Sequence, residues 1–84
     1  MNYIDYENWA EEYRQQVEVL DRKLKGRRRR NRRFATAEQR TQYENTTRIF
    51  EEMRRDCASA FAILKQRAEE IKEEEQRAES IVAQ

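Results

Sequence analysis

The chain of 84 residues contains no proline and no histidine, and only one glycine and one cysteine. With Gly26 as its single glycine, it lacks the turn residues from which β-hairpins are built. The absence of histidine removes the usual general base at neutral pH and most transition-metal sites. Cys57 has no second cysteine with which to form an intramolecular disulfide. We therefore expect an all-α protein that is not an enzyme and binds no metal, cofactor or small-molecule substrate.

Long hydrophobic runs are also missing. The longest, ASAFAIL at residues 58–64, is too short to cross a bilayer. The first twelve residues, MNYIDYENWAEE, are acidic and lack the basic and apolar segments of a signal peptide. We therefore expect a cytoplasmic protein without a membrane partner.

The composition is dominated by helix-forming residues, and the charged residues are segregated along the chain. Alanine, glutamate, lysine, leucine and arginine supply 44 of the 84 residues, a bias typical of long helices and coiled coils. The net charge of +1 combines four unlike segments. Residues 1–19 carry −4, residues 20–40 carry +8, residues 41–67 carry +1 and residues 68–84 carry −4. This asymmetry, rather than the net charge, bears on binding partners.

Two heptad patterns predict two helices within a single domain. The first pattern predicts a helix at about residues 3–25 that ends near Gly26, although arginine is a good helix former and the helix can also continue into the arginines. The second helix, at about residues 37–83, follows a capping-box signal from Thr36 to Gln39. An arginine-rich turn at residues 26–35 joins them. The first pattern comprises Tyr3, Tyr6, Ala10, Tyr13, Val17, Leu20 and Leu24.

The second pattern repeats every seven residues through Tyr43, Phe50, Cys57, Leu64, Ile71 and Ala78, with Met53, Ala60 and Ile81 at the other seam position. Five further residues widen this apolar stripe: Ile49, Phe61, Ile63, Ala68 and Val82. The predicted fold is an antiparallel helical hairpin with a short first and a long second helix. We expect the pairs Leu24–Tyr43, Val17–Phe50, Ala10–Cys57 and Tyr3–Leu64.

In that register the second helix extends beyond the first from about residue 65. The unpartnered stretch and a thin two-helix core both favour a homodimer, as a four-helix bundle or coiled coil. The residues expected in the core or dimer seam are Tyr6, Tyr13, Val17, Leu20, Leu24, Phe50, Met53, Cys57, Phe61, Leu64 and Ile71.

Three other features allow both a functional and a structural interpretation. Cys57 falls on the apolar seam, which favours a buried small residue over a nucleophile. Trp9 flanks the first seam and is a candidate partner hot spot, whereas the neighbouring tyrosines belong to the seam. The glutamates at 69, 70, 73, 74 and 75 face several directions, which favours a solvated helix surface over a carboxylate metal site.

Six arginines crowd into seven positions of the stretch GRRRRNRRF. Their mutual repulsion is relieved if an anion binds, and the planar guanidinium group suits phosphate and carboxylate. Arginine-rich segments also recur in RNA recognition. The alternative is a solvated turn. The candidate binding residues are Arg27, Arg28, Arg29, Arg30, Arg32 and Arg33.

The stretches MNYIDYENWAEEYRQQVEVLDRKLK, RIFEEMRRDC and AILKQR, with Met53, Cys57 and Arg67, resemble small helical proteins encoded in prophages of Firmicutes. This resemblance covers about half of the chain. It implies a helical hairpin without an assigned activity, acting as a phage accessory protein in a bacterial cytoplasm. Proteins of this kind often bind and inhibit host machinery.

Three functions remain open. We favour an interaction protein that docks its arginine-rich turn on the anionic surface of a host or phage macromolecule, such as an acidic protein. Direct binding of RNA or DNA through phosphate contacts is the second hypothesis, and a purely structural coiled coil is the third.

Overall fold

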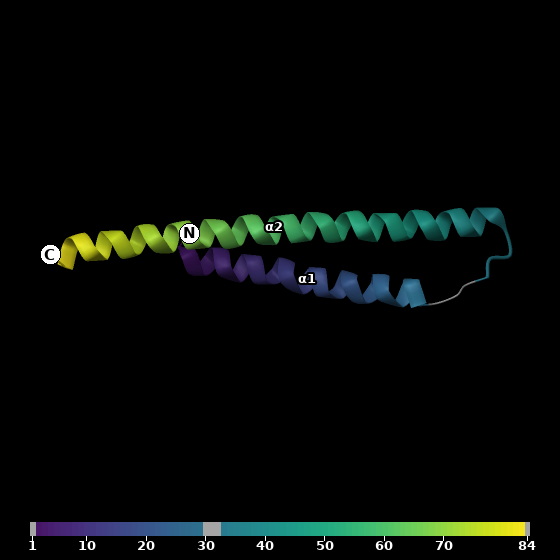
Figure 1. Ribbon diagram of the computed structural model, residues 1–84, viewed down its shortest axis with the longest axis horizontal. Coiled ribbons are helices and arrows are strands. Elements are labelled where there is room, and N and C mark those ends of the chain that lie inside the picture. Colours follow the sequence, from purple (N-terminus) through teal and green to yellow (C-terminus); the bar gives the residue numbers. More distant parts are fainter. Residues whose placement is uncertain (1, 30–32, 84) are drawn as a thin grey trace.

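Two antiparallel helices form a long rod. The structure, a computed structural model, describes residues 2–29 and 33–83, with the side chains of 28, 29 and 81–83 left out. Helix α1 spans Tyr3–Arg29 and helix α2 spans Ala37–Ala83. They pack against each other in a molecule of 73 × 17 × 14 Å (Figure 1). The predicted hairpin of a short and a long helix is confirmed.

The bounds of α2 match the prediction, whereas α1 continues past its predicted end at residue 25 to Arg29. Gly26 is therefore an interior helical residue without a positive φ. One glycine costs a helix only about 1 kcal/mol relative to alanine. The strong helix propensity of the arginines and the packing of Arg27 on α2 outweigh that cost. Residues 26–29 accordingly belong to α1 and not to the turn.

Side-chain caps define both helix starts. Thr36 Oγ1 accepts a hydrogen bond from the backbone N–H of Gln39 at 3.2 Å, as predicted. Gln39 Oε1 accepts from the backbone N–H of Ala35 at 3.1 Å, one residue before the expected Thr36 donor. At the start of α1, Asn2 Oδ1 accepts from Asp5 N–H at 3.0 Å, and Asp5 Oδ2 accepts from Asn2 N–H at 3.2 Å. This reciprocal cap was not predicted.

The pairing register of the two helices differs from the prediction by about one heptad. Cys57 Sγ donates to Gln16 Oε1 at 3.3 Å, although Ala10 was the expected neighbour of Cys57. At each level, α2 meets a residue that is closer to the C-terminal end of α1 than predicted. The predicted pairs Leu24–Tyr43, Val17–Phe50, Ala10–Cys57 and Tyr3–Leu64 are replaced by Arg27–Tyr43, Lys23–Phe50, Gln16–Cys57 and Tyr3–Lys72.

A seven-residue displacement keeps the seam residues in the seam. Leu20, Leu24 and Leu64 are buried together with two alanines, Ala10 and Ala68. Apart from Met53, the remaining predicted seam residues are half-buried: Tyr6, Tyr13, Val17, Phe50, Cys57, Phe61 and Ile71. The core between the two helices is thin.

Met53 does not lie in this core, because its side chain is 47% exposed. The side of α2 that meets α1 carries the heptad positions Tyr43, Phe50, Cys57 and Leu64. It also carries one residue after each of them, namely Thr47, Arg54, Phe61 and Ala68. These residues follow the heptad position by four, whereas Met53 follows it by three. Of the two positions predicted for Met53, core or dimer seam, the intrachain core is therefore excluded, and the dimer seam stays a prediction.

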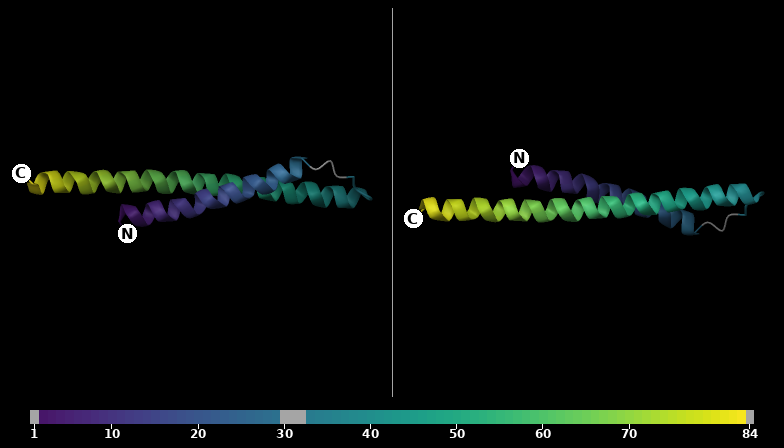
Figure 2. Two further views of the ribbon diagram at one scale, coloured as in Figure 1. Left: turned by 90° about the horizontal axis from the view of Figure 1, so that it is seen from below. Right: turned by 90° about the horizontal axis from the view of Figure 1, so that it is seen from above.

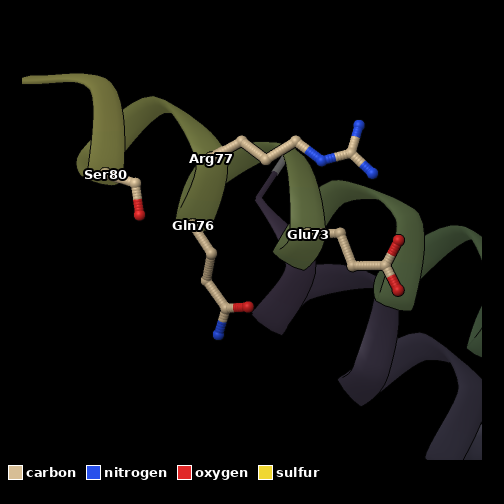
Figure 3. A pocket seen from close by; sticks show the side chains of 4 residues that line it. All are labelled: Glu73, Gln76, Arg77 and Ser80. Atoms are coloured by element: carbon tan, nitrogen blue, oxygen red, sulfur yellow. The ribbon is translucent and has the colours of Figure 1, made fainter.

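Helix α2 extends beyond α1 at its C-terminal end, and Figure 2 shows the two helices crossing at a shallow angle. The ammonium of Lys72 lies 5.8 Å from the ring centroid of Tyr3, so the uncovered stretch begins after residue 72 and not at 65. Ile71 is half-buried and thus covered. The uncovered stretch has a shallow hollow of about 410 Å³ lined by Glu73, Gln76, Arg77 and Ser80 (Figure 3).

Candidate anion-docking site at the basic end of the hairpin

Of the six arginines of the predicted site, the structure describes the side chains of Arg27 and Arg33. Arg27 lies in the last turn of α1 and is half-buried, whereas Arg33 follows that helix and is exposed. Arg28 and Arg29 complete α1, and their side chains are outside the described part of the structure. Arg30 and Arg32 lie outside the described residues altogether.

Arg27 is built into the hairpin. Its guanidinium carbon lies 4.0 Å from the ring centroid of Tyr43 and 5.3 Å from that of Phe50. Arg27 Nε donates to Thr47 Oγ1 at 2.8 Å, and Nη2 donates to the carbonyl oxygen of Tyr43 at 3.2 Å. This guanidinium therefore joins α1 to α2 through two of its three nitrogens, and its predicted binding of an anion stays a prediction.

Aromatic packing closes the basic end. The ring of Phe34 lies 5.3 Å from that of Tyr43, measured between centroids. The guanidinium of Arg27 also lies over the Tyr43 ring, and the Tyr43 hydroxyl donates to the Arg27 carbonyl at 3.1 Å. These contacts fix the approach of the connecting segment to α2.

Beside this cluster lies a polar groove of about 400 Å³. It offers hydrogen-bond donors from Arg33, Gln39 and Gln42, and its other lining residues are Arg27, Phe34, Tyr43 and Thr46. A carboxylate or phosphate group finds one exposed guanidinium and two amide groups within this groove. The groove is the described part of the predicted anion site.

Exposed cations continue from this groove along the same end of the rod. Arg22, Lys23 and Lys25 are exposed on α1, and Arg40 is exposed on α2. Arg40 Nε lies 3.1 Å from Glu44 Oε1, so one of these cations has an acidic partner within its own helix. The hairpin places the +8 segment, residues 20–40, at one end, and α2 carries the −4 segment, residues 68–84, to the other.

Toward the middle of the rod, cations and acids are paired. Arg14 bonds Glu11 and Glu18, which lowers the pKa of the Glu11 carboxyl and raises the pKa of Arg14. Arg54 pairs with Asp21 across the two helices, and the pKa of Arg54 is raised by that hydrogen bond. Excess positive charge is therefore a property of the basic end and not of the whole surface.

Trp9, the predicted hot spot, is 41% exposed and stacks on Tyr6 with a centroid separation of 6.4 Å. It lies in the N-terminal half of α1, away from the arginine-rich segment. The structure therefore does not bring Trp9 and the arginines into one site.

Sequence reasoning missed an exposed apolar surface in the middle of the rod. Val19 is 41% exposed, Ile49 54%, Met53 47% and Ile63 66%. On α2, Ile49, Met53, Ala60 and Ile63 follow at intervals of four, seven and three, a spacing that places them along one side of the helix. Asp56 lies between Met53 and Ala60 on that same side. That spacing was the available signal, and it was assigned to a broader core.

No known protein family, curated protein or solved structure matches the chain. Within the residues that the structure describes, neither helix is long and apolar enough to span a membrane. The described part of the chain also contains no group of three or more cysteine, aspartate or glutamate side chains placed to hold a metal ion.

Proposed function

We propose that the protein is a non-enzymatic interaction protein that docks the basic end of its hairpin on an anionic surface of another macromolecule. The separation of charge along the rod carries this proposal: the +8 segment occupies one end, whereas acids and cations are paired in the middle. A concentrated positive end attracts an anionic partner and orients the rod toward it.

An acidic protein surface is favoured over single-stranded nucleic acid as the partner. Single-strand binding typically uses aromatic rings on which bases stack. Among the described residues at the basic end, the rings of Phe34 and Tyr43 pack against each other, and Arg27 lies over Tyr43. The polar groove beside them offers amide and guanidinium donors, which suit carboxylates.

We also propose that the functional unit is a homodimer. The chain exposes 7031 Å², whereas a compact monomer of 10.3 kDa exposes about 5,400 Å². Only alanines and leucines are buried among the described residues, which is a small core for 84 residues. The difference in surface is large enough to accommodate a standard interface, which removes about 800 Å² from each partner.

The resemblance to prophage-encoded helical hairpins supports the further proposal that the partner belongs to a bacterial host machine. An accessory protein of this size acts by occupying a surface of such a machine. The rod of 73 Å gives it the reach to do so while only one end makes the anionic contact.

Affinity capture from a bacterial lysate, with and without nuclease, tests the proposed function. The test variant replaces Arg29, Arg30, Arg32 and Arg33 with glutamine and leaves Arg27 in place because of its contacts to α2. The matched control removes four exposed cations elsewhere, at Arg48, Arg55, Lys65 and Arg77. We expect a protein partner that survives nuclease, is lost with the test variant and is retained by the control. Equal capture by both variants contradicts the proposal.

A further inference from the structure

The two grooves between α1 and α2 differ in character. One, of about 510 Å³, is lined by Asp21, Leu24, Lys25, Glu51 and Arg54 and is bridged by the ion pair between Asp21 and Arg54. The other, of about 540 Å³, contains Val19, Leu20 and Met53 among polar neighbours. The second groove and the exposed residues Ile49 and Ile63 form what we call the apolar face, defined by Val19, Ile49, Met53, Ala60 and Ile63.

We propose that a second copy of the chain docks on the apolar face in antiparallel orientation. The spacing of the face on α2 is close to symmetric about position 56. A twofold axis at that level places Ile49 opposite Ile63 of the second copy and Met53 opposite Ala60 of the second copy. Ile49 and Met53 then meet Ile63 and Ala60 of the second copy on both sides of the axis, as an isologous interface requires. Asp56 lies on the same side of the helix and comes beside Asp56 of the second copy at the axis. That pair of like charges opposes the dimer, and the apolar contacts on each side favour it. This inference rests on the proposed homodimer and specifies its face and direction.

Helix α1 is consistent with the same axis. The contact between Gln16 and Cys57 places residues 17–18 of α1 level with position 56 of α2. In a face-to-face antiparallel dimer, α1 then lies against α1 of the second copy. Glu12 comes opposite Lys23 of the second copy, and both residues line the groove of the apolar face. Two oppositely charged pairs related by symmetry therefore lie on either side of the axis.

The charge distribution favours the antiparallel over the parallel orientation. A parallel dimer brings two +8 segments together at one end and two acidic C-terminal segments together at the other. Like charges so placed repel each other. An antiparallel dimer places the uncovered stretch of α2, with Glu73, Glu74, Glu75 and Glu79, beside the basic end of the second copy. The −4 of residues 68–84 does not cancel the +8, so each end remains positive for its proposed partner.

Charge reversal tests the pairing of Glu12 with Lys23. These residues are eleven positions apart in one helix, so they lie about 16 Å apart along it and do not contact each other within a chain. We expect Glu12→Lys and Lys23→Glu each to weaken dimerisation about tenfold at low salt, and the double variant to restore it. Sedimentation equilibrium measures the dissociation constants. A double variant as weak as the single ones overturns the antiparallel pairing.

The apolar face is tested by Met53→Glu against Ile4→Glu. The two side chains are 47% and 48% exposed, but Ile4 lies outside the apolar face. We expect Met53→Glu to weaken dimerisation at least about tenfold, because a carboxylate loses its hydration in the interface, and Ile4→Glu to leave it unchanged. Equal effects of the two substitutions overturn the assignment of the face. Circular dichroism at matched concentration separates loss of the dimer from loss of helix.

A distance measurement decides the orientation independently. In a Cys57→Ser background, spin labels at Glu38→Cys lie on an exposed position near the basic end. The axis at position 56 places the two labels 36 residues apart along the rod, or about 54 Å. A parallel bundle places them within about 25 Å of each other. A distance near 54 Å supports the inference. A short distance overturns the antiparallel orientation but leaves the dimer intact, and a monomer at all concentrations overturns both proposals.

Discussion

Arg27 of α1 and Tyr43 of α2 contact each other in two ways. The guanidinium of Arg27 lies 4.0 Å from the Tyr43 ring centroid, and the Tyr43 hydroxyl donates to the Arg27 carbonyl at 3.1 Å. The contact joins the last turn of α1 to the second turn of α2. One arginine of a run predicted to bind anions is therefore a structural residue that fixes the hairpin register.

Replacing Arg27 with alanine should lower the free energy of unfolding by about 1–2 kcal/mol. The substitution removes a cation–π contact and the hydrogen bonds to Thr47 and to the Tyr43 carbonyl. Chemical denaturation followed by circular dichroism measures the change. Arg33→Ala is the control, because Arg33 is exposed, and it should shift stability by less than about 0.5 kcal/mol. Equal effects of the two substitutions would mean that the contacts of Arg27 with α2 do not stabilise the hairpin.

Replacing Gly26 with alanine should stabilise the protein by about 0.5–1 kcal/mol. Gly26 lies inside α1, and an added Cβ meets no atom within 4 Å. Alanine adopts this helical conformation without strain and lowers the entropy of the unfolded chain. The same denaturation experiment detects the gain. A loss of stability would indicate that α1 ends at Gly26, as the sequence pattern alone had predicted.

Replacing Thr36 with alanine should cost about 1 kcal/mol, because the backbone N–H of Gln39 loses its capping acceptor. Thr46→Ala serves as the comparison. Thr46 is exposed within α2 and its hydroxyl donates to the carbonyl of Gln42, which the helix does not need. The prediction fails if the Thr46 substitution is as costly as the Thr36 substitution.

Acid should weaken the exposed ion pair between Glu11 and Arg14. The lowered pKa of Glu11 determines how stability changes with pH. Hydrogen bonding to Arg14 lowers the pKa of the Glu11 carboxyl below its usual 4.5 in the folded chain. The unfolded chain therefore takes up this proton at a higher pH, so the contribution is present above about pH 4.5 and disappears as the pH falls further. Comparing Glu11→Gln with the parent between pH 6 and pH 3 should show a smaller acid loss in the variant. The difference should be small, because both partners are exposed.

The sequence pattern predicts the two helices, the start of α2 and the seam residues, because heptad spacing and capping chemistry are local. It does not predict the register. A slip of seven residues leaves Leu20, Leu24 and Leu64 in the seam, so periodicity cannot distinguish the two registers. Contacts between distant residues, such as Gln16 with Cys57 and Tyr3 with Lys72, decide between them.

The exposure of Met53 has a similar origin. Met53 follows the heptad position of Phe50 by three residues, and Phe61 follows that of Cys57 by four. The sequence pattern does not say which of these two sides of the heptad line on α2 packs against α1. Phe61 is half-buried, whereas Met53 is exposed on the apolar face. The candidate site was predicted as a run of equivalent arginines, and only tertiary contacts distinguish Arg27 from exposed Arg33.

Salt-dependent binding by the basic end tests the central claim most directly. Fluorescence anisotropy follows binding of two labelled probes, polyglutamate and a single-stranded oligonucleotide, to the parent and to the Arg29, Arg30, Arg32 and Arg33→Gln variant. The parent should bind polyglutamate with an affinity that falls as salt rises, and the variant should lose most of that dependence while remaining helical and dimeric. The control variant with glutamine at Arg48, Arg55, Lys65 and Arg77 should bind as the parent does.

For comparison, a duplex DNA contacted by four arginines gives a slope of log affinity against log salt of roughly −4, and a single strand roughly −3. A parent that binds the oligonucleotide with such a slope, and polyglutamate weakly, would favour direct nucleic-acid recognition instead. If the variant and the parent bind both probes with the same affinity and the same salt dependence, the arginine-rich segment is a solvated turn and the account is contradicted.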